Sequence, residues 1–269
     1  MITITSSIKR HPLVAYFVLA YALAWVLIPL VVSVSVAFGL LALFGPAIAA
    51  ISVTGVIEGR SGVKQLLRRA VQGRVGLKWI AVAVGLPLLV SATVVVLNAA
   101  LLGKPIAIVP NGAPVFTLII GLLVVGEEIG WRGFALPRLQ TRFNSLTASL
   151  ILGGLWAAWH LPNAFIPGFE YYLTAFPVFL VYVVSMTVLF TWLANRTHGS
   201  VWIAWLFHAA INVSAGFLFI GDNLRQWWLS AGVFAVAALI IVIVNGSNLA
   251  RQTTAPMESA FIEQPLPQK

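Results

Sequence analysis

Long runs of hydrophobic residues, separated by short polar stretches, fill most of the chain. A membrane-spanning helix needs about 20 mostly apolar residues. By that measure the runs predict eight spans, with seven as the alternative because only Gly39 separates the first two. The predicted spans are 13–36, 38–57, 79–102, 115–135, 146–166, 173–195, 200–220 and 227–246. The pattern thus predicts an all-α, polytopic membrane protein with a single helical domain over residues 1–246.

Composition supports this interpretation. The chain is 60% hydrophobic and 9% charged, whereas a soluble domain carries about 25% charged residues. The first apolar run, from Leu13 to Gly39, exceeds the roughly 7–15 residues of a cleaved signal peptide, so we expect a retained first span. The absence of cysteine excludes disulfides, thiolate metal ligands and a cysteine nucleophile.

The net charge of +9 comes from Lys and Arg residues between the spans, which favours the positive-inside rule over nucleic-acid binding. With eight spans, the basic connections all fall on one side, and both termini are predicted to be cytoplasmic. The residues on that side are Lys9, Arg10, Arg60, Lys64, Arg68, Arg69, Arg74, Lys78, Arg138, Arg142, Arg196 and Arg251. The opposite connections carry only Lys104, Glu170, Asp222 and Arg225.

Two further segments have predicted states. In the 58–78 connection, Val63, Leu66, Leu67 and Ala70 share one helical face, which favours a short interfacial helix. An ordinary solvated basic loop is the alternative. Residues 247–269 are polar and proline-containing, and we expect a disordered cytoplasmic tail.

Charged residues within a span are costly and therefore indicate function. The chain has seven acidic residues, and two of them, Glu127 and Glu128, stand together in the fourth predicted span. Glu128 and Arg132 are four residues apart and can pair along one helical face. Glu127 points about 100° away from Glu128 and is expected to lack a local partner. One acid would then be structural and the other free to act.

Three more polar side chains fall within later spans: His160, His208 and Asn212. His208 and Asn212 are four residues apart and share a helical face. With about 1.5 Å rise per residue, Glu127 lies roughly 18 Å from the outer start of its span. His160 and His208 lie roughly 20 Å and 12 Å from the inner start of theirs. All three therefore fall at overlapping depths in the inner half and middle of the bilayer, and the pattern predicts one shared site.

Such a set of residues can hydrolyse a peptide bond in two ways. A carboxylate and a histidine can deprotonate a water molecule, while a second histidine and an amide stabilise the oxyanion. Alternatively, Glu127, His160 and His208 are the ligand set of a catalytic zinc. The HExxH motif of helical metalloproteases is absent, and the single aspartate, Asp222, excludes a two-aspartate mechanism.

The motifs resemble those of the CAAX prenyl protease and bacteriocin-processing (Abi, CPBP) family of intramembrane proteases. Glu127-Glu128-x-x-x-Arg132, Trp156-x-x-x-His160 and His208-x-x-x-Asn212 occur in the family's order, with Trp156 where phenylalanine is commonest. The resemblance covers roughly residues 115–220. It implies an eight-helix fold in which Glu127 and His160 activate water, His208 and Asn212 stabilise the oxyanion, and Glu128 and Arg132 support the site. It leaves zinc dependence and a metal-free glutamate mechanism equally open.

The expected substrate is a membrane-embedded or lipid-associated peptide or protein, in a bacterial cytoplasmic membrane. Whether that substrate is prenylated stays open. Two alternatives from other classes also stand: a non-proteolytic immunity or scaffold protein, and a proton-coupled transporter that uses Glu127 and the histidines as a relay. No inverted repeat with a matching broken helix is visible, which weakens the transporter hypothesis.

Overall fold

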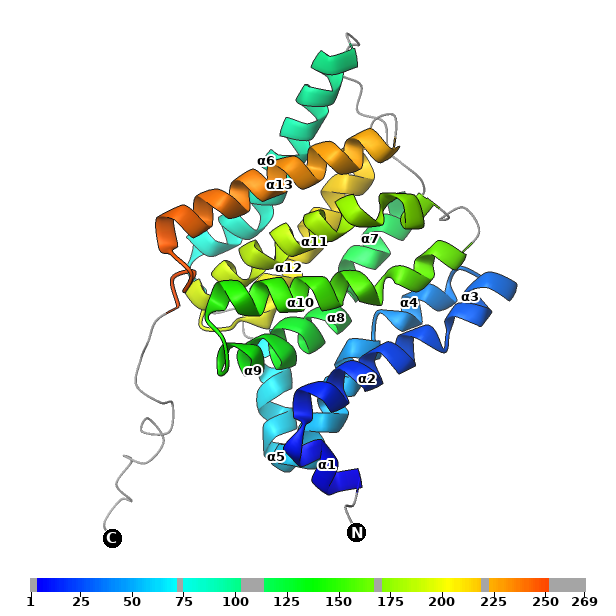
Figure 1. Cartoon of the computed structure of the whole chain (residues 1–269), viewed down its shortest axis with the longest axis vertical. Coiled ribbons are helices and arrows are strands. Elements are labelled where there is room, and N and C mark those ends of the chain that lie inside the picture. The colour runs from blue at the N-terminus through cyan, green and yellow to red at the C-terminus, as the bar shows by residue number, and fades with distance from the viewer. Residues whose placement is uncertain (1–3, 72–74, 103–113, 167–170, 219–222, 252–269) are drawn as a thin grey trace.

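All regular secondary structure in the described part of the chain is helical (Figure 1). The computed structural model describes residues 4–71, 75–102, 114–166, 171–218 and 223–251. The α-helices are α1 (Ile4–Arg10), α2 (Pro12–Trp25), α3 (Ile28–Ser33), α4 (Phe38–Ala42), α5 (Gly45–Val71), α6 (Leu77–Leu102), α7 (Pro114–Leu123), α8 (Val125–Gly130), α9 (Leu136–Gln140), α10 (Ser145–Trp159), α11 (Tyr171–Arg196), α12 (Val201–Leu218) and α13 (Asn223–Asn245). A π-helical turn (Trp131–Ala135) joins α8 to α9, and a 3-10 turn (Leu161–Phe165) follows α10. The all-α prediction is confirmed over these residues.

The predicted membrane spans are confirmed in part. Among the described residues, five helical stretches are long and apolar enough to cross a membrane, and one further apolar helix is shorter. The five are Pro12–Ser33, Phe38–Val71, Leu77–Leu101, Leu173–Arg196 and Leu224–Asn245, and the shorter one is Val201–Gly216. The protein is therefore a polytopic membrane protein. The predicted spans 115–135 and 146–166 are also helical, but the first is divided into α7, α8 and the π-turn and the second ends as a 3-10 turn, so the count of eight spans stays a prediction.

The basic connection after the second predicted span is helical as far as Val71. Gly59 (φ 68°) interrupts α5, and the following turns form a separate segment. Leu66 is buried there, while Lys64 and Arg68 are exposed. This amphipathic arrangement confirms the helix over the loop alternative; residues 72–74 of the predicted connection lie outside the described residues.

α8 lies in the middle of the view in Figure 1 and packs against both α5 and α12. α10 lies along α11, α11 along α13, and α12 against α6 and α7. Large side chains fill the space between these helices. Trp131, Phe134, Trp156, Phe190 and Phe207 are all at most 2% exposed. The core therefore closes around the helix that carries the paired carboxylates.

Two glycines let α5 approach α8 closely. A Cβ atom on Gly126 would lie 2.7 Å from the Leu43 carbonyl oxygen, and one on Gly130 would lie 2.5 Å from both Pro46 Cβ and the Tyr16 hydroxyl. Real Cβ atoms do not approach other atoms so closely, and small residues in this i, i+4 spacing are typical of tight helix contacts in membranes. The glycines fix the position of the intervening Glu127 and Glu128.

The basic connections gather at one end of the molecule, as the charge pattern predicted. Arg69 donates to the carbonyls of Gly133 (3.1 Å) and Gly199 (2.9 and 3.1 Å). Arg138 pairs with Glu58, and Arg251 donates to the Gln140 carbonyl. These contacts join the ends of α5, α9, α11 and α13. Which side of the membrane this end faces stays a prediction.

The first residues of the predicted tail are ordered. Leu249 is fully buried beside Val188 and Ala238, and the Leu146 amide donates to the Ser247 carbonyl at 2.8 Å. The chain after α13 therefore folds back onto α10 and α11 as far as residue 251. The rest of the predicted tail, 252–269, lies outside the described residues.

Candidate active site

The two carboxylates lie on α8, which starts after a break in the helix. α7 ends at Leu123, and Trp205 of α12 donates its indole N–H to the carbonyls of Gly121 and Leu122 at 3.1 Å each. This contact partly satisfies the carbonyls that a helix end leaves without partners. The break re-aims the chain, and both Glu127 (2% exposed) and Glu128 (fully buried) point into the protein.

Glu127 is held by two indole groups. Its Oε2 accepts hydrogen bonds from Trp156 Nε1 at 2.8 Å and from Trp131 Nε1 at 3.3 Å. The prediction that Glu127 lacks a local partner was wrong, because Trp131 is four residues further along the same helical face. An indole N–H in an apolar core needs an acceptor, and this carboxylate supplies it. The second oxygen, Oε1, accepts no hydrogen bond from the residues described here.

Glu128 bridges two elements through one oxygen. Its Oε1 accepts from Arg132 Nη1 and from His208 Nδ1, each at 2.8 Å. The predicted i, i+4 pair with Arg132 is confirmed, and the link to His208 of α12 is additional. The Arg132 guanidinium lies close to the rings of Trp156 and Phe190, whose centroids lie 4.2 and 3.7 Å from its central carbon. These two rings are nearly perpendicular to each other, and both make cation–π contacts with the guanidinium.

His160 is positioned by the end of α10. Pro162 has no N–H for the next helical hydrogen bond, so the helix stops and the 3-10 turn begins. The His160 Nδ1 lies 2.9 Å from the Trp156 carbonyl oxygen. α2 stabilises this helix end, since Tyr21 and Trp25 donate to the Leu155 and Trp159 carbonyls. His160 remains partly exposed.

The hydrogen bonds assign the protons on both histidines. Carbonyl and carboxylate oxygens only accept, so Nδ1 of His160 and Nδ1 of His208 each carry a hydrogen. The remaining nitrogen of each ring, Nε2, is then available for a substrate or a water molecule. It is an acceptor when the ring is neutral and a donor when the ring is protonated.

The predicted residues thus come together around Trp156. Its ring centroid lies 5.2 Å from that of His208 and 6.0 Å from that of His160, and His160 interacts electrostatically with both Glu127 and His208. Asn212 lies one turn beyond His208 on α12, half-buried, and its side chain makes no hydrogen bond to the described residues. Five of the six predicted side chains share one contact network, and Asn212 lies beside it.

Zinc binding by Glu127, His160 and His208 stays a prediction. In the described part of the chain, no group of three His, Asp or Glu side chains is placed to hold a metal ion. Glu127 Oε2 and both Nδ1 atoms are used in hydrogen bonds within the protein, whereas Glu127 Oε1 and the Nε2 atom of each histidine are available as ligands.

The sequence interpretation missed three aromatic contributions. It did not assign an indole donor to Trp131 or Trp156, or a stacking role to Phe190. The spacing held a usable signal for the first two, because Trp131 is four residues after Glu127 and Trp156 four before His160. The position of Phe190 on α11 depends on helix packing and had no such signal.

Comparison with known proteins identifies relatives of this segment. Residues 110–214 match the family model described as "Type II CAAX prenyl endopeptidase Rce1-like". A "CAAX prenyl protease 2" from Methanococcus maripaludis is 32% identical over 136 residues, which is 48% of this chain and 49% of the relative. The chain thus spans about half the length of this curated relative. The matched segment contains all of the side chains described above except those of α2.

Proposed function

We propose that the chain is an intramembrane endopeptidase, because residues 110–214 match the Rce1-like type II CAAX prenyl endopeptidase family model. The proposed reaction is hydrolysis of a peptide bond in a membrane-associated protein or peptide. The observation that carries the proposal is the separate pairing of two adjacent buried carboxylates. Each carboxylate uses one oxygen, but the partners differ: Glu127 is held by two neutral indole groups and interacts electrostatically with His160, whereas Glu128 is bound by Arg132 and His208.

Glu127 and His160 are proposed to activate the water. Glu127 Oε1 and the unprotonated Nε2 of His160 are the two acceptors available for a water molecule between them. As the water oxygen bonds to the carbonyl carbon, one water proton passes to Glu127 and the carbonyl electron pair moves to oxygen. That proton then passes to the amide nitrogen as the C–N bond breaks, which regenerates the carboxylate.

His208 and Asn212 are proposed to stabilise the oxyanion. Because the Nδ1 hydrogen of His208 is committed to Glu128, donation from Nε2 requires the doubly protonated ring. The Glu128 carboxylate lies 2.8 Å from Nδ1 and fixes the orientation of the ring, and Arg132 holds the carboxylate in place. The Asn212 amide, one turn away on the same helix, would supply a second donor.

The deciding experiment is cleavage by the Glu127→Gln variant. The amide keeps the shape of the side chain but cannot accept a proton, so cleavage should fall by about 10²–10⁴-fold. The protein would be purified in mild detergent and tested by mass spectrometry on peptides with and without a prenylated C-terminus. Thermal unfolding would check the fold. Undiminished cleavage by Glu127→Gln would overturn the proposal, and cleavage of unprenylated peptides alone would exclude a prenyl requirement.

A chelator distinguishes the metal-free mechanism from the zinc-dependent mechanism. Purified protein would be analysed for metal content, then assayed before and after treatment with a strong zinc chelator. Cleavage by metal-free protein supports Glu127 as the general base. Loss of activity on chelation, with recovery on adding zinc, would instead support Glu127, His160 and His208 as metal ligands.

A further inference from the structure

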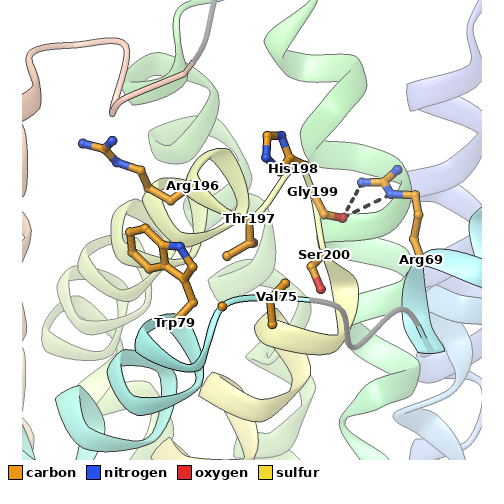
Figure 2. Close-up of a pocket in the computed structure, with 9 residues that line it drawn as sticks. Arg69, Val75, Trp79, Arg196, Thr197, His198, Gly199 and Ser200 are labelled. Atoms are coloured by element: carbon orange, nitrogen blue, oxygen red, sulfur yellow. Dashed lines mark hydrogen bonds between the residues drawn. The ribbon is translucent and has the colours of Figure 1, made fainter.

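A second polar cavity lies outside the proposed active site, at the basic end of the molecule (Figure 2). Its volume is about 230 Å³, and it is formed by the start of α6, the α11–α12 turn and the end of α5. Figure 2 shows Arg196 and Trp79 on one side of the cavity and Arg69 on the other. The proposed reaction makes no use of these residues.

The cavity is positively charged. Arg69 and Arg196 both line it, and no lining residue is acidic. Arg69 donates only to backbone carbonyls, and Arg196 donates to the Asn245 amide oxygen at 3.1 Å. Within the described residues, neither guanidinium has a carboxylate partner. Their two positive charges are therefore left for an anion from outside the chain.

Two helix N-termini add to this potential. Val75 and Gly76, directly before α6, line the cavity, as does Ser200, directly before α12. These helices have 26 and 18 residues. The N-terminus of a helix carries a partial positive charge and N–H groups that bind phosphate well. Two helix N-termini and two arginines thus line one cavity, with the Arg196 guanidinium directed toward Asn245 of α13 (Figure 2).

An apolar groove lies next to the cavity, and one pair of tryptophans links their walls. Trp79 of the cavity packs edge-to-face on Trp192, with ring centroids 5.5 Å apart. Trp192 in turn lines a groove of about 500 Å³ between α6, α11 and α13, whose other walls include Leu86, Leu89 and Ile240. Tryptophans at such a boundary are typical of the membrane interface, where headgroups meet acyl chains.

We propose that this cavity and groove together bind one anionic glycerophospholipid. The phosphate would lie between Arg69, Arg196 and the two helix N-termini, and an acyl chain would follow the groove past Trp192. Basic pockets between membrane helices are known to bind anionic headgroups. This inference does not depend on the proposed proteolysis.

Binding of the lipid headgroup in the cavity is tested by native mass spectrometry of the full chain in detergent. Phosphatidylglycerol and phosphatidylcholine are added in competition. Wild-type protein should retain phosphatidylglycerol in preference. Arg196→Gln should weaken that retention about fivefold, the effect of one basic residue near an anionic lipid. Arg142→Gln is the matched control, because Arg142 is an exposed arginine at the same end but away from the cavity. Equal losses of phosphatidylglycerol retention in Arg196→Gln and Arg142→Gln would contradict a headgroup site in the cavity.

The groove is tested by filling it. Gly85 lines the groove, and a Cβ atom there would meet nothing within 4 Å, so Gly85→Leu should fold and occupy the acyl position. Gly232→Leu on α13 is the control, with equally open space outside the groove. Phosphatidylglycerol retention should fall only for Gly85→Leu. Unchanged retention by Gly85→Leu would show that the acyl chain does not lie in the groove. Displacement of the lipid by an equal concentration of inorganic phosphate would show a free-phosphate site, and either result would overturn the lipid proposal.

Discussion

At the scale of single residues, Trp156 joins the parts of the site. Its indole N–H donates to Glu127 and its ring stacks on Arg132, while its carbonyl positions His160. Phenylalanine, the commonest residue at the resembling family position, could fill the same space but could not donate the hydrogen bond. In this chain, part of the orientation of Glu127 therefore depends on a tryptophan.

Trp156→Phe should lower kcat/KM for peptide cleavage by about 10–100-fold while the protein stays folded. A hydrogen bond to a charged group contributes about 1.5–3 kcal/mol, and about 1.4 kcal/mol corresponds to a tenfold change. Steady-state cleavage rates provide the measurement. Trp228→Phe is the control, since Trp228 is 59% exposed on α13. Wild-type rates for Trp156→Phe would show that the hydrogen bond is not needed.

Removal of Arg132 should affect stability as much as activity. Arg132→Gln leaves Glu128 buried without its cationic partner, which costs about 3–5 kcal/mol. The double variant Glu128→Gln, Arg132→Gln removes both charges and should be no less stable than Arg132→Gln alone. Denaturation midpoints in one detergent would compare the wild type, both single variants and the double variant. If the losses of Glu128→Gln and Arg132→Gln simply add in the double variant, the side chains are not coupled as described.

The residue types and their spacing predicted much of the site. The i, i+4 rule was sufficient for Glu128 and Arg132, because both lie on one short stretch of helix. The link between Glu128 and His208 was not predictable, since it spans α8 and α12 and depends on how these helices pack. Local periodicity carries no information on that packing.

At the scale of secondary structure elements, α8 is positioned by its two glycines. Gly130→Ala would place a methyl group 2.5 Å from Pro46 Cβ and from the Tyr16 hydroxyl, so α5 and α8 must separate. Overpacking of this kind costs about 1–3 kcal/mol. Thermal unfolding should show the loss, together with weaker cleavage as Glu127 moves.

Gly154→Ala on α10 is the control for this change. A Cβ atom at Gly154 meets nothing within 4 Å, and alanine favours a helix over glycine. This variant should unfold at the same temperature as the wild type or higher. If Gly130→Ala behaved in the same way, the close contact between α5 and α8 would not matter for stability.

Hydrophobic length predicted the helical spans well where the helix is continuous, as in α6, α11 and α13. It did not predict the interruption between α7 and α8, because a run of apolar residues looks the same whether the helix within it is continuous or interrupted. Trp205 on α12 donates to the carbonyls of Gly121 and Leu122 next to this interruption. Such contacts depend on the tertiary structure.

At the scale of the whole molecule, the charges divide the protein into a basic end and a nearly uncharged one. The structure places the ends of α5, α9, α11 and α13 together, and the alternation of basic connections had predicted that grouping. The orientation across the membrane follows from the positive-inside rule alone.

Single-cysteine labelling tests that orientation directly, because the natural sequence has no cysteine. Arg142→Cys should react with a membrane-impermeant maleimide only after the cell membrane is opened. Lys104→Cys, in a connection predicted for the other side, should react in intact cells. The reverse pattern would place the basic end outside and move the proposed lipid site to the outer leaflet.

The π-helical turn Trp131–Ala135 has a consequence for sequence comparison. Its closing hydrogen bond runs from the Leu136 amide to the Trp131 carbonyl, so this turn contains one residue more than an α-helical turn. A homologue with regular helix here would need one residue fewer between the positions of Glu128 and Arg138. An alignment that forbids gaps inside helices would then shift every position after the turn by one. The π-helical turn therefore predicts that alignments with such homologues contain a one-residue gap within 131–135.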